Sequence, residues 1–318
     1  MAMPILYSQS LPDRFENEEP MATVALVQPN FEPLLEWDQE NNNRRFKALE
    51  AQVKRIALMD FDLLLLPEGV TPEPIIGDYA TLEATEAMVD QVGRTVLMGS
   101  QAYNSETGTF HNGVFLVAPF RGLCTHYYAK QKLVPFGEYV PFPFKGLVNP
   151  FGGIQGEFSP GKSAAPIEFN LNNKQIKFGA LVCYEDFFPQ LARKAVVAGS
   201  DILFVATNDT WYGEEGAAYF HAAHSILRAV ENRRPVIRSG NAGWSGWIDP
   251  LGKVRECLVD DTNSIYFKGG GVMELKLNPE FSSKISFYVK YGDWFVLLSL
   301  AMTALISGGL LLKKTRGL

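Results

Sequence analysis

Three reactive side chains stand where apolar runs of the sequence end. Glu68 closes the run LLLLPE, Lys130 follows HYYA, and Cys183 closes the run IKFGALVC. A cysteine thiol can attack an acyl group when a base takes its proton and a cation or hydrogen-bond donor stabilises the oxyanion that forms. These residue types supply all three roles, so the sequence indicates acyl chemistry on a cysteine, provided that the fold brings the side chains together.

Each of the three residues also has an ordinary structural interpretation. A cysteine after a strand is commonly a small buried hydrophobic residue, and a glutamate after a proline commonly belongs to a turn or a helix cap. A lysine is usually solvated. Residue type and position alone leave both interpretations open.

Strand-like runs alternate with helix-like runs along the chain. Residues 22–28 have the pattern of a strand and 37–59 that of an amphipathic helix, and the same pair recurs at 201–207 and 217–234. The strand-like runs are apolar on both faces, which is typical of strands covered by helices. Because no linker-like stretch interrupts the pattern, we expect one α/β domain over residues 21–285.

The composition excludes several classes of protein. The chain has 318 residues, of which 47% are hydrophobic, and a formal net charge of −6, which excludes a disordered chain. An acidic chain without a long Lys/Arg run lacks the clustered cations that displace counterions from phosphates, so we expect no nucleic-acid partner. Cys124, Cys183 and Cys257 are an odd set without C-x-x-C spacing, which predicts neither a disulfide framework nor a thiolate zinc site.

Two histidines form a separate candidate site. His221 and His224 stand three apart in a helix-like run, at a spacing that metal ligands can use. Because no third ligand stands nearby, we favour helix packing or hydrogen bonding for both and expect no metal.

The C-terminal region contains a candidate membrane span. From Trp294 to Leu312 no residue is charged, and at about 1.5 Å per residue this stretch gives roughly 28 Å of helix, close to the thickness of a bilayer core. We therefore predict a transmembrane helix over 292–313, with Tyr291 and Trp294 at one interface. The alternative is a buried core helix, although core helices usually carry a polar stripe.

Basic residues follow the apolar stretch. Lys313, Lys314 and Arg316 predict a basic cytoplasmic tail over 314–318, which would leave residues 1–290 outside the cytoplasm. No signal peptide is legible in the first 30 residues, so the sequence does not explain how the α/β domain crosses the membrane.

Several local motifs resemble those of a known superfamily. L-P-E at 66–68, Y-x-K-x-x-L-V-P-F-G-E-Y-V-P at 128–141 and C-Y-E at 183–185 are similar, in order and separation, to the Glu, Lys and Cys signatures of the carbon–nitrogen hydrolase (nitrilase) superfamily. Within it, LVPFGEYVP, T-N-D-T-W-Y-G at 207–213 and a terminal GDW followed by a hydrophobic helix resemble the apolipoprotein N-acyltransferases.

The resemblance implies a fold and a set of site residues. It implies an αββα four-layer sandwich in which Glu68 is the general base, Cys183 the nucleophile and Lys130 the group that stabilises the tetrahedral intermediate. A second family glutamate maps onto Glu138. Residues expected to support the site or bind substrate are Glu138, Tyr184, Glu185, Asn208 and Trp211.

The resemblance also implies a reaction and its partners. Cys183 would attack a glycerophospholipid such as phosphatidylethanolamine and form a thioester, and the α-amino group of a diacylglyceryl-cysteine apolipoprotein would then take the acyl chain. Such a reaction requires neither a metal nor another cofactor. The expected location is the bacterial inner membrane, with the catalytic domain on the periplasmic face.

The chain departs from the family in one large respect. Family members carry a multi-helix membrane domain before the nitrilase domain, and residues 1–20 look like the connector that would leave such a domain. We therefore expect that this chain is a fragment or that a separate N-terminal membrane domain is its partner. The segment 141–159, rich in Phe, Pro and Gly, is either a mobile lid at the lipid surface or a loop packed on the body.

Two other functions compete with acyl transfer. A membrane-tethered amidase of the same superfamily would hydrolyse a small amide with the same Glu68, Lys130 and Cys183, although such a substrate requires neither the apolar helix nor the apolar segment at 141–159. The alternative that is not an enzyme is a catalytically inactive lipoprotein-binding partner.

Overall fold

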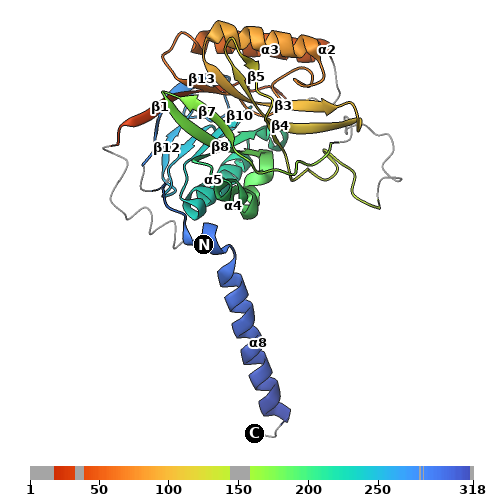
Figure 1. Ribbon diagram of the computed structural model, residues 1–318, viewed down its shortest axis with the longest axis vertical. Coiled ribbons are helices and arrows are strands. Elements are labelled where there is room, and N and C mark those ends of the chain that lie inside the picture. The colour runs from red at the N-terminus through yellow and green to blue at the C-terminus, as the bar shows by residue number, and fades with distance from the viewer. Residues whose placement is uncertain (1–17, 33–38, 144–157, 279–280, 282, 316–318) are drawn as a thin grey trace.

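The computed structural model describes residues 18–32, 39–143, 158–278, 281 and 283–315. Most of the expected connector at 1–20 and most of the segment 141–159 therefore lie outside the described residues. In the described part, two β-sheets lie face to face and helices cover both outer faces (Figure 1).

The first sheet is built around three parallel strands. Its order is β13-β1-β2-β3-β4-β5, with β6 also paired to β4, and β1, β2 and β3 run parallel. Parallel neighbours require crossover connections, which the helices α2 and α3 supply on the outer face. The bounds are β1 (Pro20–Gln28), α2 (Gln39–Ile56), β2 (Leu63–Leu65), α3 (Tyr79–Val92), β3 (Thr95–Asn104), β4 (Thr109–Ala118), β5 (Gly122–Leu123), β6 (Tyr128–Ala129) and β13 (Gly269–Lys276).

The second sheet repeats this plan. Its order is β12-β11-β10-β9-β8-β7, and β8, β9 and β10 are parallel. The helices α4 and α5 form the crossovers and lie on the outer face of this sheet. The bounds are β7 (Ile167–Leu171), β8 (Lys174–Val182), η2 (Cys183–Phe187), α4 (Pro189–Val197), β9 (Ile202–Thr207), η3 (Asp209–Tyr212), α5 (Ala217–Asn232), β10 (Val236–Gly240), β11 (Gly246–Ile248) and β12 (Val254–Cys257).

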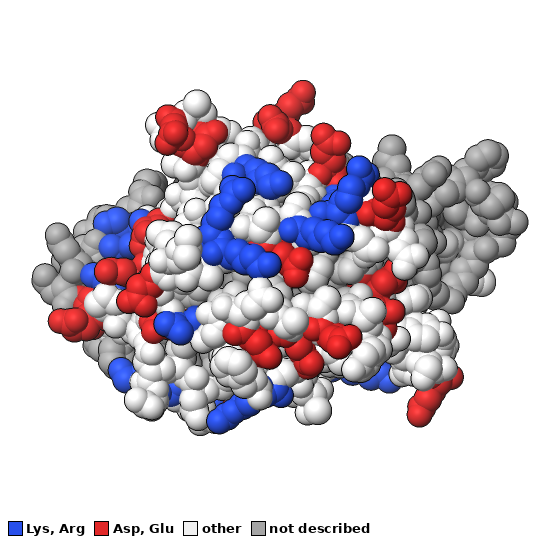
Figure 2. Space-filling model, turned by 90° about the horizontal axis from the view of Figure 1, so that it is seen from above, with Lys and Arg blue, Asp and Glu red and all other residues white. Residues whose placement is uncertain are grey.

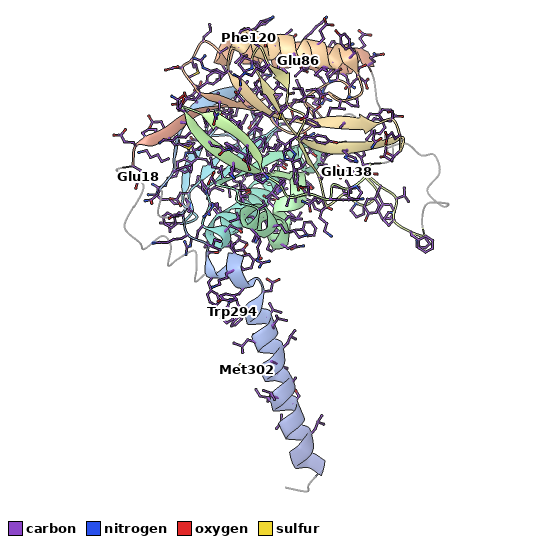
Figure 3. The ribbon with its side chains drawn as sticks, viewed as in Figure 1. Glu18, Glu86, Phe120, Glu138, Trp294 and Met302 are labelled. Atoms are coloured by element: carbon purple, nitrogen blue, oxygen red, sulfur yellow. The ribbon has the colours of Figure 1, made fainter. Side chains whose placement is uncertain are left out.

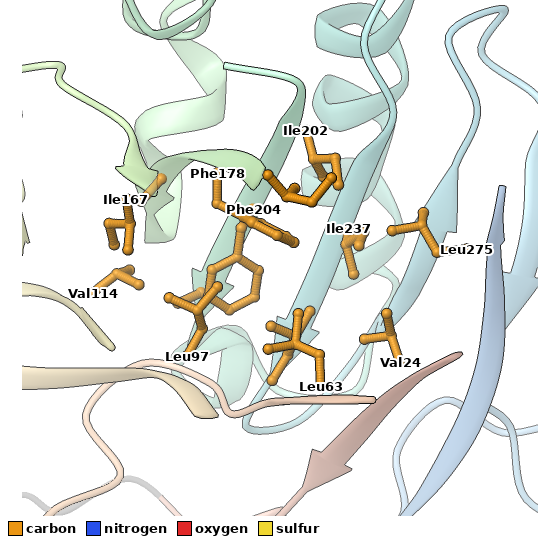
Figure 4. Packing of buried hydrophobic residues seen from close by; sticks show 14 of the residues in the cluster. Val24, Leu63, Leu97, Val114, Ile167, Phe178, Ile202, Phe204, Ile237 and Leu275 are labelled. Atoms are coloured by element: carbon orange, nitrogen blue, oxygen red, sulfur yellow. The ribbon is translucent and has the colours of Figure 1, made fainter. Parts of the chain in front are cut away.

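Three clusters of buried apolar side chains hold the layers together. The central cluster fills the space between the two sheets and includes Leu63, Leu97, Phe178 and Phe204 (Figure 4). A second cluster packs α2 and α3 on the first sheet, and a third packs α4 and α5 on the second sheet. The predicted αββα four-layer architecture is confirmed.

A single long helix leaves this sandwich at its C-terminal end. The helix α8 (Trp294–Thr315) has an 18-residue apolar window, Trp294–Leu311, none of which is buried in the protein. The alternative of a buried core helix is therefore wrong. Figure 3 shows Trp294 near the start of α8 and Met302 farther along it, away from the α/β domain.

A short helix attaches α8 to the domain. The helix α7 (Phe287–Tyr291) is capped by Ser286, whose hydroxyl also donates to the carbonyl of Glu231 in α5. Nε of Arg193 in α4 donates to the carbonyl oxygen of Val289 at 2.9 Å. These bonds fix the base of α8 against the two helices of the second sheet.

The opposite face of the molecule is polar. Viewed from the side of α2 and α3, it carries Lys and Arg interspersed with Asp and Glu (Figure 2). Mixed charges of this kind are typical of a surface in water. The charged face and α8 thus lie at opposite ends of the molecule (Figure 1).

Candidate active site

The three reactive residues lie at the ends of strands from both sheets. Glu68 follows the carboxyl end of β2, Cys183 directly follows β8, and Lys130 directly follows β6. In α/β sheets the carboxyl ends of parallel strands are the usual place for functional groups. Lys130 contacts Glu68 directly, and the charges of both act on the thiol of Cys183, so the fold brings the three side chains together.

Lys130 is held between two carboxylates. Its Nζ lies 2.9 Å from Oε1 of Glu138 and 3.5 Å from Oε1 of Glu68, and its side chain is only 1% exposed. Because an ammonium group has three donors, these two bonds leave one N–H for a third acceptor, such as an oxyanion.

Asn112 donates a hydrogen bond to each of the two carboxylates, and it is not among the site residues that the sequence predicts. Its Nδ2 donates to Oε1 of Glu68 at 2.8 Å and to Oε1 of Glu138 at 3.0 Å. Glu138 also accepts the backbone N–H of Val134 at 2.8 Å. Asn112 and Lys130 both bind Oε1 of Glu68, and no described residue donates to its Oε2, so this oxygen can receive a proton.

Two glycines allow the strands that carry these residues to approach closely. A Cβ added to Gly99 in β3 would lie 2.5 Å from Cα of Glu68, and one added to Gly113 in β4 would lie 2.3 Å from the carbonyl oxygen of Tyr128. Both distances are shorter than real Cβ contacts. Side chains at these positions would therefore displace Glu68 or the strand that precedes Lys130.

Cys183 occupies a sharp turn between β8 and η2. Its φ of 55° is in the left-handed region, which is unusual for a residue with a side chain and typical of constrained functional positions. The cysteine is 8% exposed. Burial and the nearby Glu68 carboxylate raise its pKa, while Lys130 opposes them. The thiol is therefore protonated at neutral pH and requires a base before it can attack.

Glu68 is a group that could take that proton. Burial raises the pKa of Glu68, the charge of Glu138 adds to the effect, and Lys130 opposes both. A carboxylate with a raised pKa is a stronger base than an exposed one. Burial alone would lower the pKa of Lys130, but Glu68 and the other nearby anionic groups outweigh burial and raise it, so the lysine stays cationic.

Tyr184 and Glu185 follow Cys183 in η2. The hydroxyl of Tyr184 donates to the carbonyl of Leu133 at 2.7 Å, and its ring centre lies 5.6 Å from Nζ of Lys130. Glu185 is completely buried and accepts hydrogen bonds from the backbone N–H groups of Val182, Gln131 and Lys132 and from the hydroxyl of Tyr128. Glu185 thus ties the segment after Lys130 to the turn that carries Cys183.

Asn208 and Trp211 lie on the turn after β9. Oδ1 of Asn208 accepts hydrogen bonds from the backbone of Thr210 and from the side chain of Asn241. Trp211 is 59% exposed and Tyr212 is 50% exposed, so both present aromatic surface at the end of the molecule that carries Cys183. By contrast, Trp244 and Trp247 are core residues.

The described residues contain no group of three or more His, Cys, Asp or Glu side chains that could hold a metal ion. His221 donates instead to carboxylates, and His224 stacks on Phe187 at 4.0 Å.

Two facing sheets, each covered by a pair of helices, with a buried cysteine at a strand end, define the class of nitrilase-fold proteins. The chain belongs to the carbon-nitrogen hydrolase family, whose model matches residues 23–266. This match covers the strands and helices from β2 to β12 and with them Glu68, Lys130 and Cys183.

The relatives belong to one group of acyltransferases. An apolipoprotein N-acyltransferase of Geobacter metallireducens is 32% identical over 295 residues, which are 89% of this chain and 53% of that protein. The apolipoprotein N-acyltransferase of Thermotoga maritima is 28% identical over 287 residues, which are 88% of this chain and 50% of that protein. The chain spans about half the length of the curated relatives that it matches.

Solved structures support the fold. Nit3 of Saccharomyces cerevisiae, a member of the nitrilase superfamily, matches with a TM-score of 0.58 and 18% identity over 86% of this chain and 96% of its own. An amidase from Nesterenkonia sp. matches with a TM-score of 0.59 and 18% identity over 86% of this chain and 97% of its own.

Proposed function

We propose that this chain is the catalytic part of an apolipoprotein N-acyltransferase. It would move a fatty acyl chain from a glycerophospholipid to the α-amino group of the diacylglyceryl-cysteine of an apolipoprotein. The observation that carries the proposal is the combination of a buried Glu68–Lys130–Cys183 site with an unburied apolar helix fixed to the same domain. The names of the relatives support the choice of substrates.

In the first half-reaction, Glu68 takes the proton of the Cys183 thiol and the thiolate attacks the ester carbonyl of the phospholipid. The spare N–H of Lys130 donates to the oxyanion of the tetrahedral intermediate, since its other donors are held by carboxylates. When the intermediate collapses, the lysophospholipid oxygen leaves with the proton from Glu68, and Cys183 keeps the acyl group as a thioester.

In the second half-reaction, the α-amino group of the apolipoprotein attacks the thioester carbonyl. Glu68 accepts a proton from the attacking nitrogen, the amide forms, and the Cys183 thiolate leaves and takes that proton back. A thioester suits this sequence because it stays reactive toward an amine while one substrate replaces the other. The proposed kinetics are therefore ping-pong.

We propose that residues 292–313 cross the bilayer, that residues 21–285 form the catalytic domain and that 314–318 is a cytoplasmic tail. Aromatic rings gather at the base of the helix, where Phe287 lies 4.5 Å from Tyr291 and 5.2 Å from Trp294 between ring centres. Such rings are typical anchors at a membrane interface. With basic residues beyond the span, this arrangement supports a catalytic domain on the periplasmic face of the inner membrane.

The test is a transfer assay with the full chain in detergent. A phospholipid with labelled acyl chains and a synthetic peptide that begins with diacylglyceryl-cysteine are incubated with the chain or with its Cys183→Ala variant. Label in the peptide as an amide, absent with the variant, supports acyl transfer. Cleavage of small amides without transfer would favour the amidase, and peptide binding without either reaction would favour the inactive partner.

A further inference from the structure

A second cluster of charged side chains lies directly behind the nucleophile. We call it the His221 cluster. It joins four elements, η2, η3, α5 and β10, none of which carries Glu68 or Lys130. Each member is at most 2% exposed, and the members are Asp186, Asp209, His221, Ser225 and Arg238.

Both ring nitrogens of His221 face carboxylates. Nδ1 lies 2.7 Å from Oδ1 of Asp209, and Nε2 lies 2.9 Å from Oδ1 of Asp186. An ionised carboxylate only accepts hydrogen bonds, so each nitrogen has to carry a hydrogen. The geometry therefore calls for an imidazolium ion rather than either neutral tautomer.

The charges of the cluster balance only if His221 is a cation. Arg238 contributes one positive charge and lies 2.6 Å from Oδ2 of Asp186 and 3.4 Å from Oδ2 of Asp209. Two buried carboxylates with one guanidinium would leave a buried negative charge, which is strongly unfavourable. Burial and Arg238 by themselves lower the pKa of His221, but Asp186 and Asp209 outweigh them and raise it.

The same imidazole contacts the backbone of the nucleophile. Nε2 lies 3.2 Å from the carbonyl oxygen of Cys183, the residue whose φ of 55° is in the left-handed region. Arg228, about two helical turns farther along α5, donates to the carbonyl oxygen of Asp186 at 2.8 Å. The turn that aims the thiol is thus held from behind by two cations of one helix.

We propose that His221, protonated on both ring nitrogens, is the positioning residue of the nucleophile: it holds the Cys183 turn in its left-handed conformation and so directs the thiol toward Glu68 and Lys130. This inference rests on the proposed role of Cys183 as the nucleophile. His221 does not touch the reacting atoms, so its effect is on the rate of acylation and not on substrate binding.

Two substitutions separate its hydrogen bonds. The amide nitrogen of glutamine falls near the position of Nε2, whereas that of asparagine falls near Nδ1. His221→Gln therefore retains a donor toward the Cys183 carbonyl, and His221→Asn loses it. Because a displacement of about 1 Å at a reacting atom costs about 100-fold in rate, we expect Cys183 acylation to slow about tenfold in the first variant and about 100-fold in the second.

The matched control is His224→Gln on the same helix. His224 stacks on Phe187, and no described residue forms a hydrogen bond with its ring. Its substitution should change the acylation rate less than twofold, and none of the three variants should change the KM for phospholipid. Equal rates for His221→Asn and the wild type would overturn the inference, and so would a change confined to KM.

A spectroscopic readout tests the imidazolium itself. In ¹⁵N-labelled full chain in detergent, His221 is expected to show two N–H signals at pH 7. In Asp209→Asn one carboxylate is neutral, so the ring should lose a proton at lower pH, and one of its two N–H signals should disappear at lower pH than in the wild type. Charged and titratable groups that face the ring are Asp186 and Cys183 from η2, Asp209 from η3, Arg238 from β10, and Arg228 and His224 from α5.

These readouts do not depend on acyl transfer. A single N–H on His221 at pH 7, or a pH profile that Asp209→Asn leaves unchanged, would overturn the inference even if the chain transfers acyl groups. If the wild type forms no acyl-enzyme but both readouts behave as expected, the proposed function fails while the doubly protonated His221 behind the Cys183 turn stands.

Discussion

The ammonium group of Lys130 lies 2.9 Å from Oε1 of Glu138, in an ion pair whose lysine side chain is 1% exposed. Glu138 also accepts hydrogen bonds from Asn112 and from the backbone of Val134. The carboxylate of Glu138 therefore forms the closer ion pair with Lys130 and is fixed in place by two further hydrogen bonds. Glu68 lies farther from the same ammonium, at 3.5 Å, and its Oε2 accepts no hydrogen bond from the described residues. We therefore propose that the two carboxylates differ in role, with Glu138 as the anchor of the lysine and Glu68 as the base.

Replacement of the anchor tests this division. In Glu138→Gln, the lysine loses its closer anion and pairs with Glu68, and the charge that helps to raise the pKa of Glu68 disappears. A weaker base should slow acylation of Cys183 by about 100-fold, a typical contribution of one acid–base group. The acylation rate is measured by quenched-flow mass spectrometry, with the exposed Glu106→Gln as the control. An unchanged rate in Glu138→Gln would contradict the assignment.

The pH dependence of acylation reports on Glu68. Its carboxylate must be ionised to act as a base, so the rate should fall as pH drops through its pKa, which burial places above the ordinary value of 4.5. Glu68→Gln should lower the rate by at least about 100-fold and abolish this acid limb. An acid limb that persists in Glu68→Gln would belong to another group.

Glu185 should matter for stability more than for chemistry. In Glu185→Gln, an NH₂ group that cannot accept hydrogen bonds replaces one carboxylate oxygen. Two of the four hydrogen bonds are therefore lost, either those from Gln131 and Lys132 or those from Val182 and Tyr128. Leaving buried donors unpaired costs about 1–3 kcal/mol, so the denaturant midpoint should fall clearly. The exposed Glu83→Gln on α3 is the control and should unfold like the wild type. A midpoint equal to that of the control would show that these bonds contribute nothing to the fold.

Membrane attachment should depend on the lipid face of α8. Leu300 and Leu305 are 62% and 76% exposed in the protein, and an arginine at each costs about 2.5–3.5 kcal/mol on insertion scales. The double variant Leu300→Arg, Leu305→Arg should be released from membranes by alkaline carbonate, whereas the wild type should stay. Leu58→Arg, at an 88% exposed position on the α/β domain, serves as the control and should also stay. Retention of the double variant would argue that α8 does not span the bilayer.

Much of the fold could be predicted because its elements follow local patterns. The strand at 22–28 and the helices near 37–59 and 217–234 appear as β1, α2 and α5 with shifts of a few residues at their ends. The strand β7 has no such pattern, because Ile167–Leu171 mixes buried and exposed residues, and it is a strand only through its pairing with β8.

The candidate site was predictable only in part. Glu68, Lys130 and Cys183 each end a visible apolar run, so their positions could be read locally. Asn112 lies inside the strand β4, and its role depends on the pairing of β4 with β6, which no local pattern encodes. The sequence predicts helix packing or hydrogen bonding for His221. It does not identify the two carboxylate partners, because they come from η2 and η3 and meet the histidine only in the fold.

The most direct measurement is mass spectrometry of the full chain after incubation with phosphatidylethanolamine in detergent, with Cys183→Ala alongside. The proposed mechanism predicts an acyl mass on the peptide that contains Cys183, which hydroxylamine removes and which the variant lacks. An acyl mass on another residue, or none in a preparation that cleaves small amides, would contradict acyl transfer through Cys183.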